Sequence, residues 1–404
     1  MKILVTGAKG FIGKNLVAEL RNRNYDDIFE FDLDTKEEFL EEYCKEADFV
    51  FNLAGINRPG RVEEFMEGNC DFVANLLNTL RKHDNPCPIL LSSSVQAELD
   101  NPYGVSKRAG EELYLAYGKE TGAKVFVYRL PNVFGKWCRP NYNSAVATFC
   151  NNIAANLPIT VNDPETILNL VYIDDVIEEF IKVLEKSNDG KEQSLNGKDR
   201  QEGFQGEEKQ EEKQKEEKQK EEKQIEEGYY NIPTVYEVRL GDVADLIYSF
   251  KDSRENLSLP DLADGFTKKL YSTYLSYLPA NQFAYPLKMN EDERGSFTEF
   301  IRTKDRGQVS VNISKPGIVK GNHWHHTKNE KFLVVAGQGV IRFRRIDSEE
   351  VISYFVDGKK LQVVDIPPGY THNIENLGES DMVTVMWVNE PFDKERPDTY
   401  FLEV

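Results

Sequence analysis

Residues 1–13 of the chain, MKILVTGAKGFIG, decide the fold of its N-terminal part. A short apolar strand over 2–5 leads into Gly7, Gly10 and Gly13, and a helix is predicted to continue over 15–24. Glycines at such a turn let backbone N–H groups approach a pyrophosphate, and the helix N-terminus favours its charge. The stretch therefore predicts a dinucleotide-binding turn at the carboxyl end of a strand.

The alternation of strand and helix continues beyond this turn. Short apolar runs predict strands at 28–32, 49–53, 89–91 and 125–128, with helical stretches between them. Such alternation is typical of a parallel, doubly wound, Rossmann-like sheet of the α/β class. A less regular region is expected over about 129–276.

Polar residues close several of these strands. Asp32 ends the second strand, where an acid can bond the adenosine ribose, and Ser94 ends the fourth. Tyr103 and Lys107 stand one helical turn apart, and a cation beside a phenol lowers its pKa, so Tyr103 could pass a proton to a carbonyl oxygen. The residues predicted to contact the cofactor are Gly7, Lys9, Gly10, Phe11, Ile12, Gly13, Asp32, Leu53, Ala54, Gly55, Tyr103 and Lys107.

The stretch 187–228 differs from everything around it. Near-repeats of Glu-Glu-Lys-Gln begin at Glu207, Glu211, Glu216 and Glu221. Because apolar residues are almost missing, the stretch cannot bury enough surface to offset its ordering entropy, and a five-residue spacing keeps no constant helix face. We expect an exposed insertion, acting either as a solvated spacer or as a partner-binding segment.

From residue 292 onward the pattern changes to all-β. Many short strands bounded by Gly, Pro and Asn predict a sandwich or small barrel, with a domain boundary at 289. The two predicted domains are therefore 1–288 and 289–404. The predicted strands are 297–302, 308–314, 331–335, 339–344, 352–355, 361–366 and 382–387.

Four of the chain's five histidines fall in this part. His323, His325 and His326 precede Glu330, and His372 follows a Pro-x-Gly turn. Imidazoles gathered with a carboxylate are the ligand set of a divalent transition metal. Zinc is the simplest assignment, while iron, manganese and nickel also fit.

The composition limits which binding partners and which cellular location we expect. A net charge of −19 argues against nucleic acid or an anionic membrane as the main partner. No apolar run reaches the length of a membrane span, and the opening strand carries no signal-peptide pattern, so we expect a cytoplasmic protein. The five cysteines lack paired metal spacing and are interpreted as reduced core thiols.

Over roughly residues 1–275, the motifs resemble the extended short-chain dehydrogenase/reductase family of nucleotide-sugar enzymes. The resemblance implies that Ser94 holds the substrate carbonyl, that Tyr103 donates a proton and that Lys107 binds the nicotinamide ribose. It also implies a sugar-nucleotide region entered at Arg129 and Asn132. Only eight residues separate Ser94 from Tyr103, so the loop over the sugar must be built differently from that of many relatives.

The choice of cofactor stays open at this point. Asp32 favours NADH because an acid there repels a 2′-phosphate, whereas Lys9 and Lys36 could supply the cation that NADPH needs.

The histidine motifs resemble the cupin family, apart from the missing glycine at Leu361. This implies an all-β cupin barrel with His323, His325, Glu330 and His372 in the metal pocket. The segment from 292 to 323 also resembles the dTDP-4-keto-6-deoxyhexose 3,5-epimerases, where the residue matching His323 is the base. Because a metal-bound imidazole nitrogen cannot accept a proton, Lys320, His325 and His326 remain the candidates for that role.

The whole chain, apart from the insertion, resembles bifunctional capsular polysaccharide enzymes of the UDP-N-acetyl-L-fucosamine pathway. The resemblance rests on 91–97, 101–104, 133–144, 270–279 and 321–332. It implies C3 epimerisation of a UDP-4-keto sugar by the cupin and NADPH-dependent C4 reduction, with zinc and a homodimer. Two alternatives stay open: a C4 reductase whose cupin holds a structural metal and serves dimerisation, and a non-catalytic sugar-nucleotide sensor.

Overall fold

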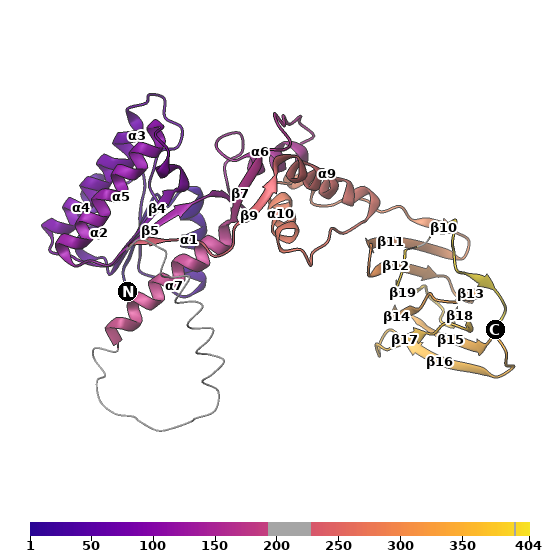
Figure 1. The fold of residues 1–404 in the computed structure, drawn as a ribbon. Helices are drawn as coiled ribbons and strands as arrows, with labels where there is room; N and C mark the ends of the chain where they lie inside the picture. The colour runs from indigo at the N-terminus through magenta and orange to yellow at the C-terminus, as the bar shows by residue number, and fades with distance from the viewer. Residues whose placement is uncertain (193–227, 392) are drawn as a thin grey trace, which may run out of the picture. The chain divides into compact units, whose positions relative to one another are not determined.

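The structure is a computed structural model that describes residues 1–192, 228–391 and 393–404 (Figure 1). Its internal contacts divide the chain into two compact units, Met1–Asp245 with Ser272–Tyr277 and Leu246–Tyr271 with Leu278–Val404. The Glu-Glu-Lys-Gln repeats of the predicted insertion lie outside the described residues. Helix α7 extends through Glu192, so the first residues of the predicted insertion, 187–192, are helical.

The first unit is built on a parallel sheet in the order β2-β1-β3-β4-β5-β8, which confirms the predicted α/β class. The order reverses beside β1, which has β2 on one side and β3 on the other. Connections leave this point on opposite faces, so a crevice opens at the carboxyl ends of the strands. The strands are β1 (Ile3–Thr6), β2 (Ile28–Phe31), β3 (Phe49–Asn52), β4 (Ile89–Ser94), β5 (Val125–Leu130) and β8 (Tyr229–Tyr230).

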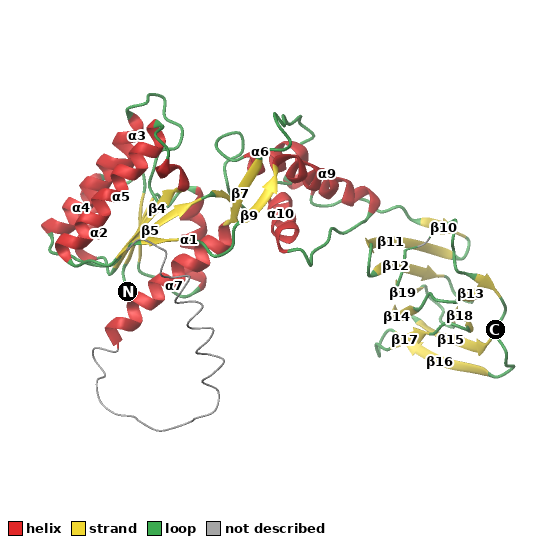
Figure 2. Ribbon diagram, viewed as in Figure 1, coloured by secondary structure: helices red, strands yellow, loops and turns green. Residues whose placement is uncertain are grey.

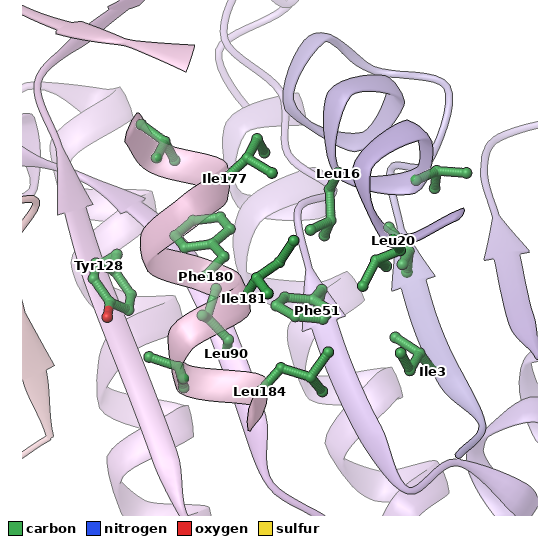
Figure 3. Packing of buried hydrophobic residues seen from close by; sticks show 14 of the residues in the cluster. Ile3, Leu16, Leu20, Phe51, Leu90, Tyr128, Ile177, Phe180, Ile181 and Leu184 are labelled. Atoms are coloured by element: carbon green, nitrogen blue, oxygen red, sulfur yellow. The ribbon is translucent and has the colours of Figure 1, made fainter. Parts of the chain in front are cut away.

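Each face of this sheet has its own apolar core. Along β1, Ile3 and Val5 enter one cluster and Leu4 enters the other, as the two-residue period of a strand requires. In the first cluster, Phe180 and Ile181 of α7 pack with Leu16 and the sheet residues (Figure 3). The helices on that face are α1 (Phe11–Asn22) and α7 (Ile173–Glu192), and those on the other are α2 (Glu37–Glu46), α4 (Phe72–Lys82) and α5 (Pro102–Thr121).

The region predicted to be irregular, 129–276, is regular over most of its described length. A second sheet pairs β6 with β7 in parallel and β7 with β9 antiparallel. Short or polar strands such as β9, with alternating exposure, leave a weak apolar signal, which explains the wrong prediction. The elements are β6 (Asn132–Phe134), α6 (Ala145–Ala154), β7 (Ile167–Tyr172), β9 (Tyr236–Arg239), α9 (Leu240–Asn256) and α10 (Gly265–Ser276), with short turns α3 (Glu64–Met66), η1 (Glu67–Asp71), η2 (Val95–Glu98) and η3 (Ala280–Gln282) elsewhere.

From β10 to β20 the described chain is strand and loop (Figure 2), as predicted. Two antiparallel sheets enclose a core that includes Phe332, Ile341, Phe343 and Ile374. One sheet contains β10 (Asn290–Asp292), β11 (Gly295–Thr303), β12 (Gly307–Ser314), β19 (Met382–Val388), β14 (Glu330–Ala336) and β17 (Val363–Ile366). The other contains β16 (Val351–Asp357), β15 (Gln338–Arg345), β18 (Tyr370–Asn376), β13 (Val319–Trp324) and β20 (Tyr400–Phe401).

Candidate functional site

The glycine turn after β1 has the geometry of a phosphate cradle. Gly7 has φ +66°, and a Cβ there would lie 2.8 Å from the backbone nitrogen of Ala54. A Cβ on Gly13 would lie 2.2 Å from the Gly7 carbonyl oxygen, so both positions need glycine. Gly10 caps α1 without a side-chain partner, so the first N–H groups of the helix are left for an anion.

A cavity of about 850 Å³ opens over this turn. It brings together residues that are far apart in sequence but lie at the carboxyl ends of the strands, as the crevice of a doubly wound sheet does. Most of the predicted cofactor, catalytic and substrate residues line it. They are Gly7, Lys9, Gly10, Phe11, Ile12, Gly13, Leu53, Gly55, Ser94, Tyr103, Lys107 and Asn132.

Asp32 and Ala54 are not among the lining residues of this cavity. The Asp32 carboxylate accepts hydrogen bonds from the backbone N–H groups of Lys9 at 2.7 Å and of Leu33 at 2.8 Å. The Lys9 ammonium pairs with Asp34. Asp32 therefore holds the glycine turn against β2, while Ala54 packs beneath Gly7.

The reactive trio lies where β4 ends and α5 begins. Asn101 caps α5 by accepting the Gly104 N–H at 2.8 Å, with Pro102 in the first turn, which places Tyr103 and Lys107 on the cavity side. The Lys107 ammonium is buried and donates to the Ser92 carbonyl at 3.3 Å. Burial lowers the pKa of Lys107 to about 8, although Glu111 raises it.

The predicted lowering of the Tyr103 pKa by Lys107 is wrong in this structure. Burial raises the pKa of Tyr103, and a hydrogen bond with the Ser94 side chain offsets only part of that change. The Lys107 ammonium is 5.9 Å from the centre of the Tyr103 ring, facing the Ser92 carbonyl. Tyr103 is thus held as a neutral phenol, the form that can donate a proton.

Arg129 does not line the cavity, so its predicted contact with substrate is not supported. Its guanidinium donates to both carboxylate oxygens of Glu111, at 2.6–3.1 Å, and also pairs with Glu98. Glu111 is fully buried and accepts from Ser93 and Tyr229 as well. Because a buried carboxylate needs a counter-charge, Arg129 is a structural partner of Glu111.

Four predicted metal ligands meet in the second unit. β13 and β18 are paired so that His323 stands opposite His372, and Glu330 begins β14. One ligand atom from each of His323, His325, Glu330 and His372 lies within 4.8 Å of the others. The structure thus brings together the whole predicted ligand set.

The donor atoms of this cluster fit a cation. Glu330 Oε2 lies 3.1 Å from His372 Nε2 and 3.6 Å from His325 Nε2. Yet these atoms and His372 Nδ1 are buried without a well-formed hydrogen bond in the described protein. Buried polar atoms normally find partners, and a divalent cation would supply one to several of them at once.

The electrostatics of the cluster favour a neutral imidazole at His323 and an ionised carboxylate at Glu330. Burial lowers the pKa of His323 to about 4, with repulsion from His372 adding to it. Burial alone would raise the pKa of Glu330, but His325 and His372 outweigh it and lower that pKa to about 2. Glu330 in turn raises the pKa of His325 against the effect of burial. Neutral imidazole and carboxylate are the forms that bind metals.

Three members of the cluster, His323, Glu330 and His372, line a pocket of about 250 Å³. Asp292, Arg294 and Lys320 are also on its wall. The Lys320 ammonium donates to Asn312 Oδ1 and to the Ile313 carbonyl, both at 2.8 Å, and burial lowers its pKa. His326 is exposed, and its ring contacts Trp324 and Tyr400. It does not line this pocket, so its predicted role with a substrate proton is not supported.

Two family models match the chain. The NAD dependent epimerase/dehydratase family matches residues 3–196, and the polysaccharide biosynthesis C-terminal domain matches residues 290–400. A UDP-2-acetamido-2,6-beta-L-arabino-hexul-4-ose reductase of Pseudomonas aeruginosa is 42% identical over 404 residues, covering 100% of this chain and 99% of the relative. The chain belongs to this reductase family.

Solved structures agree with the assignment to the reductase family. The capsular polysaccharide assembling protein CapF of Staphylococcus aureus has a TM-score of 0.85 and 53% identity, with both chains covered completely. The fold is also similar to that of a Thermus thermophilus UDP-glucose 4-epimerase in complex with NAD, over 69% of this chain and 100% of the other, at a TM-score of 0.50 and 19% identity. The resemblance to bifunctional capsular enzymes is confirmed at the level of family, and the first family model supports a nicotinamide cofactor.

Other residues of the reductase's large cavity were missed by the sequence reasoning. Arg139, Tyr142 and Trp137 line it, and the Arg139 guanidinium stacks 5.0 Å from the Tyr142 ring centre. They lie in the stretch 133–144, whose similarity to relatives was noted without a role for any residue.

In the described part of the chain, no helix combines the length and apolar character needed to cross a bilayer.

Proposed function

We propose that the chain is a bifunctional nucleotide-sugar enzyme of capsule or surface polysaccharide synthesis. The second unit epimerises C3 of UDP-2-acetamido-2,6-dideoxy-L-arabino-hex-4-ulose, and the first then reduces C4 with NADPH. The product is UDP-2-acetamido-2,6-dideoxy-β-L-talose, a precursor of UDP-N-acetyl-L-fucosamine. The proposal rests on one observation: one chain carries a dinucleotide-type cavity with Ser94, Tyr103 and Lys107, and a second pocket with a His/Glu cluster.

The order of the two steps follows from carbon acidity. A proton leaves a sugar carbon readily only beside a carbonyl, because the carbanion is then an enolate. Reduction of the C4 ketone removes that carbonyl, so epimerisation at C3 has to come first. Irreversible reduction then draws an otherwise nearly balanced epimerisation forward.

In the first unit, each residue of the trio has a role that its position supports. Ser94 holds the C4 carbonyl oxygen, and Tyr103 donates its phenolic proton to that oxygen as charge develops there. Lys107 binds the nicotinamide ribose. Its ammonium also places a positive charge near the Tyr103 ring as the phenol gives up its proton. The reduced nicotinamide, when bound, supplies the hydride.

The cofactor we assign is NADPH. Asp32, the residue that favours NADH, is engaged with the backbone of the glycine turn rather than with the cavity. Lys9 lines the cavity, and its exposed ammonium, which pairs with Asp34, is the cation that we assign to a 2′-phosphate. Comparing kcat/KM for NADPH and NADH tests this assignment, and a preference for NADH would overturn it.

In the second unit, His323, His325, Glu330 and His372 would hold zinc. A zinc ion, when bound, supplies Lewis acidity that polarises a carbonyl oxygen. Among Lys320, His325 and His326, only Lys320 both lines the pocket and lies outside the ligand cluster. Burial lowers its pKa from the ordinary value, towards that of a group able to accept a proton, so we assign to Lys320 the removal of the C3 proton.

The proposal includes a domain boundary at 289 and a homodimer. The boundary is supported by β10 beginning at Asn290. The homodimer is supported by exposed apolar side chains on the edge strand β16, where Ile352 is 40%, Tyr354 44% and Phe355 75% exposed. Sedimentation of the purified protein tests the dimer, and a Phe355→Asp variant should shift it towards monomer.

The decisive experiment supplies the 4-keto sugar nucleotide in D2O without reduced nicotinamide. Deuterium at C3 establishes the epimerase independently of the reductase. A Lys320→Met variant should lose this exchange while keeping its metal. If the wild-type protein exchanges nothing at C3 yet still forms the alcohol when NADPH is added, the bifunctional proposal is wrong.

A second candidate is a C4 reductase whose second unit holds a structural metal and serves dimerisation. It is favoured by the name of the Pseudomonas relative, a reductase. A His372→Ala variant separates the two proposals. Loss of dimer or stability with C3 exchange retained favours the second candidate, whereas loss of exchange in a folded dimer favours the bifunctional enzyme.

A sensor without activity is excluded if Tyr103→Phe abolishes turnover.

A further inference from the structure

The C-terminal segment of the chain lies against the strand that carries the histidines. β20 pairs with β13, so that Phe401 stands opposite His323 and Tyr400 opposite Trp324. The Leu402 N–H donates to the Asn322 carbonyl at 3.0 Å. This pairing brings Asp398 to the loop that joins β13 to β14.

The Asp398 carboxylate closes that loop. Its oxygens accept the backbone N–H groups of His326 at 3.0 Å, Thr327 at 2.9 Å and Lys328 at 2.9 Å, and the Thr327 hydroxyl at 3.0 Å. Three successive amides pointing at one carboxylate form an anion-binding concavity, and hydrogen bonds to an ionised acceptor are among the strong ones. Residues 326–328 of the loop before Glu330 are therefore held by one side chain from the C-terminal segment, whereas Asn329 is held by Asn389.

The backbone of the same residue orients a metal-ligand candidate. The Asp398 carbonyl oxygen lies 2.5 Å from His325 Nδ1. A carbonyl oxygen only accepts, so Nδ1 carries the hydrogen, and Nε2, which lies 3.6 Å from Glu330 Oε2, is the ring atom left to bind a metal. A hydrogen-bond acceptor behind a metal-binding histidine sets the tautomer and the orientation of its ring.

The backbone of Asp398 has a conformation that restricts what can replace it. Its φ is +40°, in the left-handed region that Asp and Asn tolerate better than other residues with side chains. The hydrogen bonds of the carboxylate hold the residue in this conformation, and with it the direction of the carbonyl. The side chain and the carbonyl thus act together on His325.

We propose that Asp398 is a positioning residue of the metal centre: its carboxylate fixes the 326–328 loop and its carbonyl aims His325 Nε2 at the site. This inference rests on the proposed metal centre. It predicts that ligand geometry depends on the last residues of the chain, outside both histidine motifs.

The test compares Asp398→Asn with the wild-type full-length protein. Asparagine keeps the left-handed backbone but removes the charge, so we expect zinc to bind about 10- to 100-fold more weakly in competition with a chromogenic chelator. Cobalt loaded in place of zinc should show a changed d–d absorption spectrum. Thr327→Ala, which removes one donor and leaves the three amides, should give a smaller shift in the same direction.

The control is Asp347→Asn, because Asp347 is exposed and pairs with Arg345. It should bind zinc as the wild type does. Binding is measured well below the unfolding transition, with circular dichroism confirming the folded state, so that a purely structural loss does not imitate the effect. If the wild type holds zinc and Asp398→Asn matches it in affinity and cobalt spectrum, the inference is wrong. If the wild type holds no metal at all, the proposed centre itself fails.

Discussion

The two pockets differ in whether their buried polar groups have hydrogen-bond partners within the protein. In the first unit, Tyr103 bonds Ser94, Lys107 bonds the Ser92 carbonyl, and Glu111 has Arg129 as its counter-charge. In the second unit, His325, Glu330 and His372 keep buried donor and acceptor atoms that the described protein leaves without a well-formed hydrogen bond.

This difference shows which site depends on a ligand for its stability. An unsatisfied buried polar atom costs about 1–3 kcal/mol, and a bound cation would remove that cost for several atoms of the His/Glu cluster at once. The dinucleotide cavity carries no comparable cost, because the protein itself satisfies its reactive groups. We therefore expect the first site to be preformed and the second to gain its rigidity from a metal.

The largest expected effect separates the two activities. Tyr103→Phe removes the proton donor and should lower C4 reduction about 10²- to 10⁴-fold, measured by NADPH oxidation. Exchange of the C3 proton in D2O should persist, because the other pocket is untouched. Tyr43→Phe, whose ring stacks on Phe29, is the matched control and should be unaffected. Loss of both activities in Tyr103→Phe would show that the pockets are not independent.

The next effect is on stability. Arg129→Met leaves the Glu111 carboxylate buried without its counter-charge and should lower the free energy of unfolding by about 3–5 kcal/mol. In the second unit, Arg345→Met removes an exposed partner of Asp347 and should change it by about 0–1 kcal/mol. Urea denaturation measures both, and equal losses would contradict the structural role given to Arg129.

Metal removal probes the second pocket directly. If zinc binds the folded protein and not the unfolded protein, free zinc at a hundredfold excess over Kd raises the free energy of unfolding by about 2.7 kcal/mol. Chelation should therefore lower the unfolding midpoint of the second unit by several degrees and leave NADPH binding to the first unchanged. Calorimetry and cofactor titration with and without chelator measure the two responses. A chelator with no effect on the midpoint would contradict a zinc-stabilised cluster.

The smallest effect is a pH dependence in the first pocket. Burial lowers the pKa of Lys107 to about 8, so the ammonium is present below that pH and lost above it. Since the cation is the form that binds ribose and supports Tyr103, kcat/KM for NADPH should fall about tenfold per pH unit above pH 8. Lys107→Arg keeps a charge at every such pH and should lack this descending limb, at a lower overall rate. A flat profile for the wild type would remove Lys107 from this role.

The sequence predicted the first pocket from local signals. The glycine turn, Ser94 and the Tyr103–Lys107 pair each mark a strand end or a helix start, and strand ends of a parallel sheet meet at one edge. Glu111 was missed, although it continues the four-residue spacing of Tyr103 and Lys107 along α5. The ion pair of Arg129 with the buried Glu111 carboxylate was not predicted, because only the packed structure brings these two side chains together.

In the second unit, the residue types predicted the metal ligands, but two of the strands that carry these ligands were not predicted. β13 and β18 were missed because their polar, ligand-bearing residues interrupt the apolar alternation by which strands are recognised. His325 and His326 both stayed candidates for the proton transfer, because neighbouring side chains leave the backbone in different directions and only the fold decides which of them joins the ligand cluster.

The sequence by itself determined the two chemistries, because glycine spacing and the supply of imidazole, carboxylate, phenol and amine groups are properties of residue type. Only the tertiary structure decided which of those groups act together. Asp398 shows why: its bonds to the loop at 326–328 join residues about seventy positions apart, and hydrogen-bond geometry between such distant groups exists only once both sheets are packed.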